Sequence, residues 1–472
     1  MDTKALRQKI LDLAIHGKLV PQDPNDEPAS VLLERIRTEK ERLIKEGKIK
    51  KGKKSAKTSD KPHYPYELPK GWEWCKLGDL AYVGTGATPL TSCKYYYENG
   101  NIAWINSSST KVPFIAKASN FITQKAIEET NCLVYPKGTL VIAMYGEGKT
   151  RGQISELLID AATNQACAAV CPYVEATKEY LKLFFEGNYL HIRALAEGGN
   201  QPNLSLGKIQ NYEIPLPPLD EQKRILEQAK KLLLQVENIE KEKEKNKNSI
   251  KQAMAKILNL AIHGKLVPQD PNDEPASELL KRVNPKAEII SDNGHYQNLP
   301  KGWCLTTLGS ITNYGSCVNV SVQEIPKDAW VLELEDIEKD SAKILCARHK
   351  KDREIKGVRH RFKAGDILYS KLRTYLNKVL IAPNEGFCTT EIIPISVKLG
   401  IHNKYICHVL RSQAFLDYTA QCGYGVKMPR LSTKDAQNGI IPLPPYNEQL
   451  RIVSMVEKLL ADLGTIEESL AR

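Results

Sequence analysis

An internal repeat is the feature that most constrains how this chain folds. The segment from Lys9 to Ser30 recurs as Lys256 to Ser277, and the two copies differ only where Asp12 is replaced by Asn259. A self-similar period of this size is the signature of a duplicated architecture. We therefore expect two related halves, each containing one copy of the segment.

Two longer segments lie between these connectors, from Leu68 to Ile214 and from Leu299 to Ile441. Each opens with Leu-Pro-Lys-Gly-Trp and closes with Ile-Pro-Leu-Pro-Pro, followed three positions later by Glu-Gln. Their interiors differ in sequence almost throughout. The simplest interpretation is that the connectors do one identical job twice, while the long segments recognise different things. Homogenisation of the connectors by gene conversion is the alternative.

The central connector has the pattern of a coiled-coil helix. Apolar residues alternate in steps of four and three over about five heptads. Pro217-Pro218 precedes the pattern, so we expect the helix to begin there with Asp220 as its N-cap, and to end at Gly264. At 1.5 Å per residue it would span roughly 60 Å. The seam positions are Ile225, Ala229, Leu232, Val236, Ile239, Ile250, Ala253, Ile257 and Leu260.

The two ends of the chain carry a second, interrupted copy of this seam. By the offset of the repeats, Arg472 corresponds to position 245 and Met1 to position 248, so joining the ends would rebuild the central helix. We therefore expect two long antiparallel helices related by a pseudo-two-fold axis. An amphipathic face on an ordinary surface helix is the alternative. The seam residues are Ile452, Val456, Leu459, Leu463, Ile466 and Leu470, continued by Leu6, Ile10 and Leu13.

The expected fold class is α+β, with two mixed α/β domains in a pseudo-two-fold arrangement, separated by two long antiparallel coiled-coil helices. Strand-like apolar runs include Leu140–Ala143, Ala168–Val170 and Asp366–Tyr369, with short helices such as Lys178–Gly187 between them. The expected boundaries are an N-terminal helical region and Lys-rich linker at 1–60, a first domain at 61–218, a central coiled-coil region at 219–285, a second domain at 286–445 and a C-terminal helix at 446–472.

Charge favours a polyanionic partner but does not establish one. The formal net charge is +11 at pH 7. Part of this excess lies in the segment from Lys40 to Lys61, which is either a solvated, partly disordered linker or an arm that contacts phosphates. The sequence has no run of about 18 apolar residues and no secretory start, and its 11 cysteines lack metal-ligand spacing. We expect a cytoplasmic protein with no membrane contact.

The motifs as a set resemble type I restriction–modification specificity subunits. The resemblance rests on the Leu-Ala-Ile-His-Gly-Lys-Leu-Val-Pro-Gln-Asp-Pro stretch at Leu13 and Leu260, on the Leu-Pro-x-Gly-Trp openings and on the Ile-Pro-Leu-Pro-Pro-x-x-Glu-Gln exits. It covers essentially the whole chain, and the ordered double occurrence of the motifs makes it specific.

The resemblance implies a function and a set of partners. Each long segment would be a target-recognition domain that reads one half of a bipartite, asymmetric site in double-stranded DNA. The helical regions would set the gap between the halves and dock two copies of the modification (methyltransferase) subunit. That complex methylates adenine at N6, and ATP-dependent restriction subunits join it for cleavage. S-adenosylmethionine, ATP and Mg²⁺ would bind in the partner subunits, and this chain would bind no cofactor.

Motif searches favour a chain that does no catalysis of its own. Gly146–Thr150 resembles the end of a phosphate-binding loop, but the first glycine that such a loop requires is replaced by Ala143. Pro442–Tyr446 lacks the Asn or Asp of the amino-methyltransferase motif, and Glu354–Lys356 matches only the tail of a nuclease carboxylate motif. Three alternatives stay open: a restriction enzyme with its own nuclease, a scaffold that binds no DNA, and a spare specificity copy exchanged by recombination.

Candidate DNA-reading residues follow from loops that coincide in the two domains. Arg, Lys, Asn and Gln side chains are those that reach base edges, and further cations contact phosphates. Solvated loops, or caps of the following turns, are the alternative, and Trp72 and Trp303 are expected to anchor the cores. The DNA-binding candidates are Lys149, Arg151, Gln153, Gln201 and Asn203 in the first domain, and Lys371, Arg373, Tyr375, Lys427 and Arg430 in the second. The partner-binding candidates are Leu13, His16, Lys18, Leu260, His263 and Lys265, with no metal site and no catalytic residue.

Overall fold

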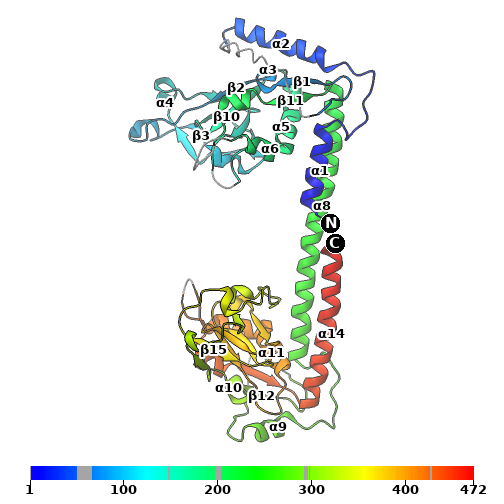
Figure 1. The fold of residues 1–472 in the computed structure, drawn as a ribbon, viewed down its shortest axis with the longest axis vertical. Coiled ribbons are helices and arrows are strands. Elements are labelled where there is room, and N and C mark those ends of the chain that lie inside the picture. The colour runs from blue at the N-terminus through cyan, green and yellow to red at the C-terminus, as the bar shows by residue number, and fades with distance from the viewer. Residues whose placement is uncertain are drawn as a thin grey trace. The chain divides into compact units, whose positions relative to one another are not determined.

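The chain forms two compact units. The computed structural model describes residues 2–49, 66–146, 149–196, 203–291, 296, 298–425 and 428–471. Contacts divide it into a first unit, Met1–Glu242, and a second unit, Lys243–Arg472. The long helix α8 (Leu219–Ile262) contributes its first part to one unit and its last part to the other (Figure 1).

The first unit is a mixed α/β domain with flanking helices. Its helices are α1 (Thr3–Ile15), α2 (Ala29–Lys45), α3 (Leu77–Leu80), α4 (Gln124–Glu129), α5 (Lys178–Gly187), α6 (Tyr189–Ala194) and α7 (Leu206–Gln210). Its strands are β1 (Glu73–Lys76), β2 (Ala81–Thr85), β3 (Ile102–Ile105), β4 (Phe114–Ile115), β5 (Asn120–Ile122), β6 (Val134–Tyr135), β7 (Leu140–Ala143), β8 (Ile154–Leu157), β9 (Ala161–Thr163), β10 (Cys167–Pro172) and β11 (Glu213–Leu216). They form sheets in the orders β2-β10-β7-β8-β4, β5-β3-β9-β6 and β1-β11.

Strand β7 shows why an uninterrupted apolar run suits this sheet. All four residues of Leu140–Ala143 are buried, as expected for a strand that is covered on both faces. Side chains alternate across a strand, so Leu140 and Ile142 join the cluster that contains α5. Val141 points the other way, into a separate cluster with β3, β8 and β9. The sheet therefore separates two small cores.

The second unit repeats this plan with a different set of strands. Its helices are α9 (Ala276–Val283), α10 (Leu308–Ile311), α11 (Asn403–Arg411), α12 (Gln413–Cys422), α13 (Thr433–Asn438) and α14 (Tyr446–Ala471). Its strands are β12 (Cys304–Thr307), β13 (Val318–Val320), β14 (Val331–Leu332), β15 (Arg359–Phe362), β16 (Ile367–Ser370), β17 (Val379–Ile381), β18 (Gly386–Thr389), β19 (Ile392–Ile395) and β20 (Ile440–Leu443). The sheet orders are β12-β20, β13-β15-β18-β14 and β17-β16-β19. As in β7, Ile367 and Tyr369 face one cluster and Leu368 faces another.

Several predicted elements are confirmed. The run Leu140–Ala143 is β7, Ala168–Val170 lies inside β10, and Asp366–Tyr369 corresponds to β16 with a shift of one residue. The helix predicted at Lys178–Gly187 is α5 with the same bounds. The mixed α/β class is therefore observed in both units.

The seam predicted along α8 is less exposed than the residues around it. Ile225 and Ala229 are fully buried, and Val236 and Ile250 are 2% and 8% exposed. Within the first unit, Ile225 and Ala229 share a core cluster with residues of α1. Within the second unit, the last turns of α8 share a cluster with the start of α14 (Figure 1).

The helix α8 begins directly after the proline pair, as predicted, but Asp220 is not its N-cap. The helix begins at Leu219, and the amide of Gln222 donates to the carbonyl of Pro218 at 2.9 Å. Asp220 therefore lies inside the first turn and is not the N-cap, because the chain can enter the helix directly from the proline pair. Its carboxylate pairs with Lys223 at 2.7 Å instead.

The Lys-rich linker is shorter than predicted. Lys40 and Lys45 belong to α2, and the ammonium group of Lys40 donates to the carbonyl of Gly78 at 2.8 Å. The amphipathic face of α2 buries Leu32, Leu33 and Ile36, which extends the helix into the cationic stretch. The remaining lysines, from position 50 to position 61, lie outside the described residues.

Candidate nucleic-acid and partner interfaces

In the first unit, the polar loop after β7 is held against α6. The hydroxyl of Tyr189 donates to the carbonyl of Lys149 at 2.6 Å, and Arg193 donates to the carbonyl of Arg151 at 3.4 Å and to the Tyr189 hydroxyl at 3.2 Å. The carbonyls of Lys149 and Arg151 are thereby tied to α6. Lys149 is exposed, whereas Arg151 and Gln153 are half-buried.

The second predicted loop of the first unit, Gly198 to Asn203, ends beside the first. The amide of Leu204 donates to the carbonyl of Met144 at 3.1 Å, which places Asn203, an exposed residue, next to the end of β7. Gln201 lies outside the described residues.

The second unit brings its predicted loops together in the same register. The amide of Leu431 donates to the carbonyl of Lys371 at 2.9 Å, the counterpart of the bond between Leu204 and Met144. The amide of Arg373 also donates to the carbonyl of Pro429 at 2.8 Å. Lys371 and Arg373 are half-buried, and Tyr375 is 56% exposed. Lys427 lies outside the described residues.

The loop of the second unit holds two residues in the left-handed conformation. Arg373 has φ of 53° and Asn377 has φ of 49°. Non-glycine residues adopt this region at a cost, and they do so mostly at functional sites and tight turns. The 3-10 turn Thr374–Leu376 between them carries Tyr375 outward.

Arg430 is committed to an internal partner. Its Nε and Nη2 both donate to the carboxylate of Glu391 at 3.1 Å, and this charge raises the pKa of Arg430. A bidentate pair fixes the guanidinium plane. In this geometry Arg430 holds the loop rather than presenting free donors to a base.

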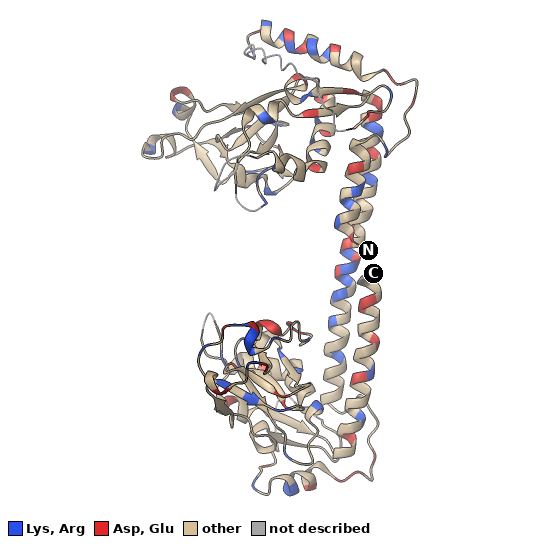
Figure 2. Cartoon of the chain, viewed as in Figure 1, with Lys and Arg blue, Asp and Glu red and all other residues tan. Residues whose placement is uncertain are grey.

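A further basic stretch of the second unit, from Arg348 to Arg361, is also largely paired. Arg353 donates to Asp336 at 2.6 Å and Arg359 donates to Glu333 at 2.8 Å, and all four side chains are at most 24% exposed. Lys351 pairs with Asp328 at 2.8 Å. Along α8, acidic residues lie among the basic ones as far as Glu244, whereas the part from Lys245 to Ile262 carries four lysines and no acidic residue (Figure 2).

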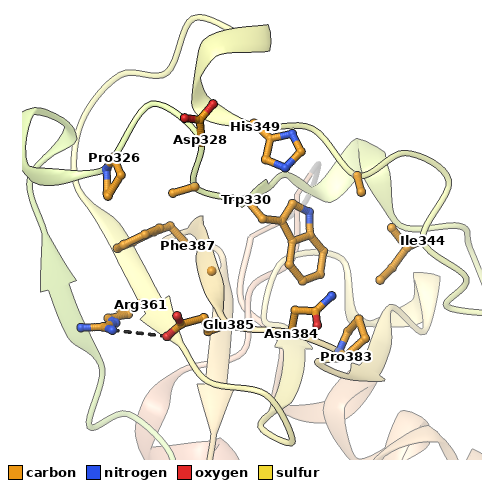
Figure 3. Close-up of a pocket in the computed structure, with 13 residues that line it drawn as sticks. Pro326, Asp328, Trp330, Ile344, His349, Arg361, Pro383, Asn384, Glu385 and Phe387 are labelled. Atoms are coloured by element: carbon orange, nitrogen blue, oxygen red, sulfur yellow. Dashed lines mark hydrogen bonds and ion pairs between the residues drawn. The ribbon is translucent and has the colours of Figure 1, made fainter.

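A hollow of about 610 Å³ opens beside this stretch (Figure 3). Its walls are mainly Trp330, Phe387, Ile344 and Pro383, and Arg361 meets Glu385 across its floor at 3.4 Å. The indole N–H of Trp330 has no partner among the described residues, but this atom is inaccessible to solvent. A molecule in the hollow would therefore meet apolar faces and not this donor.

The duplicated connectors form an identical polar cluster in each unit. We call Gln22, Asp26, Trp72, Glu221 and Arg224 the first clasp. The indole N–H of Trp72 donates to Glu221 Oε2 at 3.0 Å, and the amide of Gln22 donates to Glu221 Oε1 at 3.1 Å and to the carbonyl of Gly17 at 2.7 Å. Arg224 donates to both oxygens of Asp26, at 2.5 and 3.1 Å.

The second clasp consists of Gln269, Asp273, Trp303, Glu448 and Arg451. Trp303 donates to Glu448 Oε2 at 3.0 Å and Gln269 donates to Oε1 at 3.0 Å. Arg451 donates to Asp273 at 2.6 Å, and its charge lowers the pKa of that carboxyl. The three recurring motifs, which have different offsets along the chain, thus meet at one place in each unit.

Burial sets the electrostatics of both clasps. Glu221 and Glu448 are each 1% exposed. Loss of hydration raises the pKa of both carboxyls, while the hydrogen bonds from the glutamine and the tryptophan oppose this shift.

The predicted partner-binding residues lie in and beside the last turn of α1 and of α8. His16 and His263 each donate an Nδ1–H to a carbonyl four residues earlier, at 2.7 and 2.8 Å, and both rings are half-buried. Lys18 and Lys265 are exposed, and Leu13 and Leu260 are half-buried. The ring of His16 lies 4.2 Å from that of Tyr66, which lines a hollow of about 730 Å³ with Trp72 and Trp74.

Glu354, from the incomplete nuclease motif, and the upstream carboxylates Asp340 and Asp352, which could complete it, are engaged in local interactions. Asp340 pairs with Lys251 at 2.8 Å, Asp352 accepts from the backbone of His349 at 3.0 Å, and Glu354 pairs with Lys356 at 3.2 Å. Across the described ranges, no group of three or more His, Cys, Asp or Glu residues is placed to hold a metal ion. No helix in that part of the chain is both long and apolar enough to cross a membrane.

Sequence reasoning found the loops but not the clasps. The Glu-Gln pair after each domain exit was visible as a repeated mark, and Trp72 and Trp303 were expected only to fill the cores. The indole donors, Gln22 and Asp26 were missed, because the clasp joins segments whose offsets differ.

These features define a duplicated two-unit protein in which mixed α/β domains that differ in sequence are mounted on identical helical connectors. Residues 69–251 and 349–471 match the model of the type I restriction modification DNA specificity domain. The chain therefore belongs to the family of type I restriction–modification specificity subunits, as the sequence motifs indicated.

Individual relatives agree with this membership. The chain is 28% identical to the EcoAI specificity subunit of Escherichia coli, across 97% of this chain and 89% of the relative. It is 27% identical to the EcoEI specificity subunit of Escherichia coli, across 96% and 88%. A solved chain from work on complex assembly and conformational transition of the type I R-M system has a TM-score of 0.58 at 17% identity, across 86% of this chain and 94% of that one. At that identity the last likeness supports the fold alone.

Proposed function

We propose that each unit reads one half of a bipartite, asymmetric DNA site and that the chain itself does no chemistry. The observation that carries the proposal is the pairing of two diverged domains with two identical clasps. One identical connector used twice suits one kind of partner bound twice, whereas two different domains suit two different half-sites. B-DNA presents equivalent groove faces one turn apart, about 34 Å, so a spacer between two readers selects a gap length.

The domain boundaries follow from this division of labour. We assign residues 61–218 and 286–445 to target recognition, 219–285 to the central spacer, and 1–60 and 446–472 to the parts of a second spacer. The buried seam of α8, together with the core clusters it shares with α1 and α14, supports an antiparallel coiled coil with pseudo-two-fold symmetry.

The candidate DNA-reading residues are the predicted loops after β7 and β16. Lys149 and Tyr375 are exposed, and hydrogen bonds hold the carbonyl of Lys149 and the amide of Arg373 nearby, which suits contact with a duplex. Arg151, Gln153, Lys371 and Arg373 lie in the same loops, and Asn203 and Arg430 lie beside them. Backbone fixation lowers the entropy cost of a contact and favours discrimination between bases.

The candidate partner surface is the exposed side of the duplicated connectors. The clasps account for the identity of the buried residues, but not for that of Lys18 and Lys265, which are exposed. Together with Leu13, His16, Leu260 and His263 they give two equivalent docking positions for two modification subunits. S-adenosylmethionine would bind in those subunits, and ATP and Mg²⁺ in the restriction subunits, all in the cytoplasm.

Methylome sequencing tests the proposal directly. DNA would be sequenced from cells that carry this chain with its modification subunit, and from cells that carry the modification subunit alone. A new methyladenine motif with two short specified halves and a fixed gap is the expected result. A stable complex that yields no motif would contradict the proposal and point to a silent copy or a scaffold.

A further inference from the structure

The clasp carboxylates connect three segments of each unit that are far apart in sequence. Glu221 lies in the first turn of α8, Trp72 stands where the recognition domain opens, and Gln22 belongs to the loop after α1. One carboxylate oxygen takes the N–H of the domain and the other takes the N–H of the loop. The corresponding distances in the second clasp are 3.0 and 3.0 Å, against 3.0 and 3.1 Å in the first.

Burial of a carboxylate costs desolvation free energy, so such a group adds little net stability to a fold. Its desolvation opposes folding, and an apolar residue of similar size is often as stable or more stable at such a position. What the carboxylate adds is direction, because two oxygens with fixed lone pairs define the angle between the groups that donate to them. Its presence in both units, beside domains that otherwise differ, indicates that this angle matters in both.

Each clasp also contains an ion pair, which ties the first turns of the helix to the same loop. Arg224 follows Glu221 by one turn and grips Asp26 with two hydrogen bonds, and Arg451 grips Asp273 in the second unit. The start of the helix is thus tied to the loop by a charge pair and to the domain by the glutamate. Rotation of the domain about its helix would break at least one of these bonds.

We propose that Glu221 and Glu448 are positioning residues that fix the direction of each recognition domain on its helix, and thereby the number of base pairs between the two half-sites. The inference rests on the proposed function. Neither residue would touch DNA. The half-site sequences are set by the loops, and the gap tolerance is set by the clasps.

The test is Glu221→Gln in the full chain, co-expressed with its modification subunit and read out by methylome sequencing. The amide keeps the size of the side chain but offers one acceptor where two donors converge, so one donor of the clasp faces an N–H. We expect the same half-site sequences, at least a tenfold loss of methylation at the original gap, and new methylated sites whose gap differs by one base pair. Glu448→Gln should give the same pattern, because the second clasp has the same geometry.

Trp72→Phe provides a second test variant, since it removes one donor and leaves the carboxylate. In the double variant Trp72→Phe/Glu221→Gln the opposed N–H groups are gone, so its loss of methylation at the original gap should be smaller than the product of the two single losses. If Glu221→Gln does not assemble, Trp72→Phe alone should still broaden the gap.

The outcomes separate this inference from the proposed function. A wild-type chain with no bipartite motif would overturn the proposed function and the inference with it. A wild-type motif with variants that methylate only the original gap, at any level, would overturn the inference alone. A loss of stability by itself lowers methylation at every site equally and leaves the gap unchanged.

Discussion

Gly17 and Gly264 adopt a left-handed backbone conformation at the turn that follows the helix in each connector. Their φ values are 64° and 65°, and a Cβ at either position would collide with Pro69 or Pro300. Glycine is the residue that adopts this conformation without strain, at a turn where a helix ends. The carbonyls of Gly17 and Gly264 also accept hydrogen bonds from the side-chain amides of Gln22 and Gln269.

Gly17→Ala should therefore destabilise the chain. The left-handed conformation alone costs an alanine about 1–2 kcal/mol, and the contact with Pro69 adds to this. Chemical denaturation would measure the loss, and Gly264→Ala should match it. The control is Gly464→Ala inside α14, where nothing lies within 4 Å of the new Cβ. That change should stabilise the helix slightly, and equal effects at all three positions would contradict the explanation.

His408 makes the second unit sensitive to acid. It is 8% exposed on α11, and neither ring nitrogen has a hydrogen-bond partner among the described residues. Burial, followed by the charge of Arg411, lowers the pKa of His408 to about 4 from 6.5. Between these pH values the unfolded chain binds a proton that the folded chain does not, so the free energy of unfolding falls as pH falls from 6.5 to 4.

His408→Leu should remove this part of the acid dependence. The window corresponds to about 3 kcal/mol, at 1.36 kcal/mol per unit of pKa. Denaturation of both proteins at pH 7.5 gives the baseline difference, since the histidine is neutral in both states there. The difference should then move in favour of the variant at pH 5 and below. A difference that is independent of pH would show that His408 is not buried in its neutral form.

At the scale of single residues, the sequence indicated which loops carry basic and polar side chains, but not which hydrogen-bond partner each side chain has. The loops with Lys149, Arg151 and Arg373 were found because they coincide in two diverged domains. The pairing of Arg430 with Glu391 was not, because it depends on how a loop closes over the end of β16. Trp330 and its hollow carried no motif that would have singled them out.

Under the proposed function, α8 is the spacer between the two recognition domains. Its seam residues keep a heptad phase from Ile225 to Leu260, so an insertion that preserves the phase should lengthen the helix without moving the seam.

A repeat of Glu237–Lys243 inserted directly after Lys243 should lengthen the gap in the DNA target. Seven residues add about 10.5 Å, or about three base pairs at 3.4 Å each. Methylome sequencing should then show the original half-sites with a longer gap. A two-residue insertion is the control, because it rotates the seam by about 200° and should lower methylation at every gap. An unchanged gap after the heptad insertion would contradict the spacer role.

Some helices and strands could be predicted from the local sequence alone. The strands β7 and β16 were predicted because each is a short, uninterrupted apolar run, and α5 was predicted between such runs. The N-cap of α8 and the length of α2 were not, since a helix end depends on which neighbouring groups satisfy its free amides and bury its apolar face.

At the scale of the whole molecule, duplication predicts independence of the two units. Each has its own core clusters and its own clasp, and the loops that carry Arg151 and Arg373 belong to different units. A change in one loop should therefore affect the reading of one half-site only.

Arg151→Ala should relax one half of the methylation motif, and Arg373→Ala should relax the other. A good contact to a base edge contributes about 1–3 kcal/mol to discrimination, so methylation of altered half-sites should rise by roughly 10- to 100-fold relative to the original. The methylomes of the two variants provide this comparison. Equal relaxation of both halves by one change, or no relaxation, would contradict the placement.

The sequence by itself determined that the chain is a duplication, that a heptad seam runs through its centre, and that apolar runs form strands inside each domain. These are properties of spacing along the chain, and spacing is visible in one dimension. Tertiary structure decided that Gln22, Trp72 and Glu221 meet, and that their counterparts meet again with different separations. Such contacts join segments as much as 199 positions apart, and their geometry depends on how the intervening domain packs, which no local period encodes.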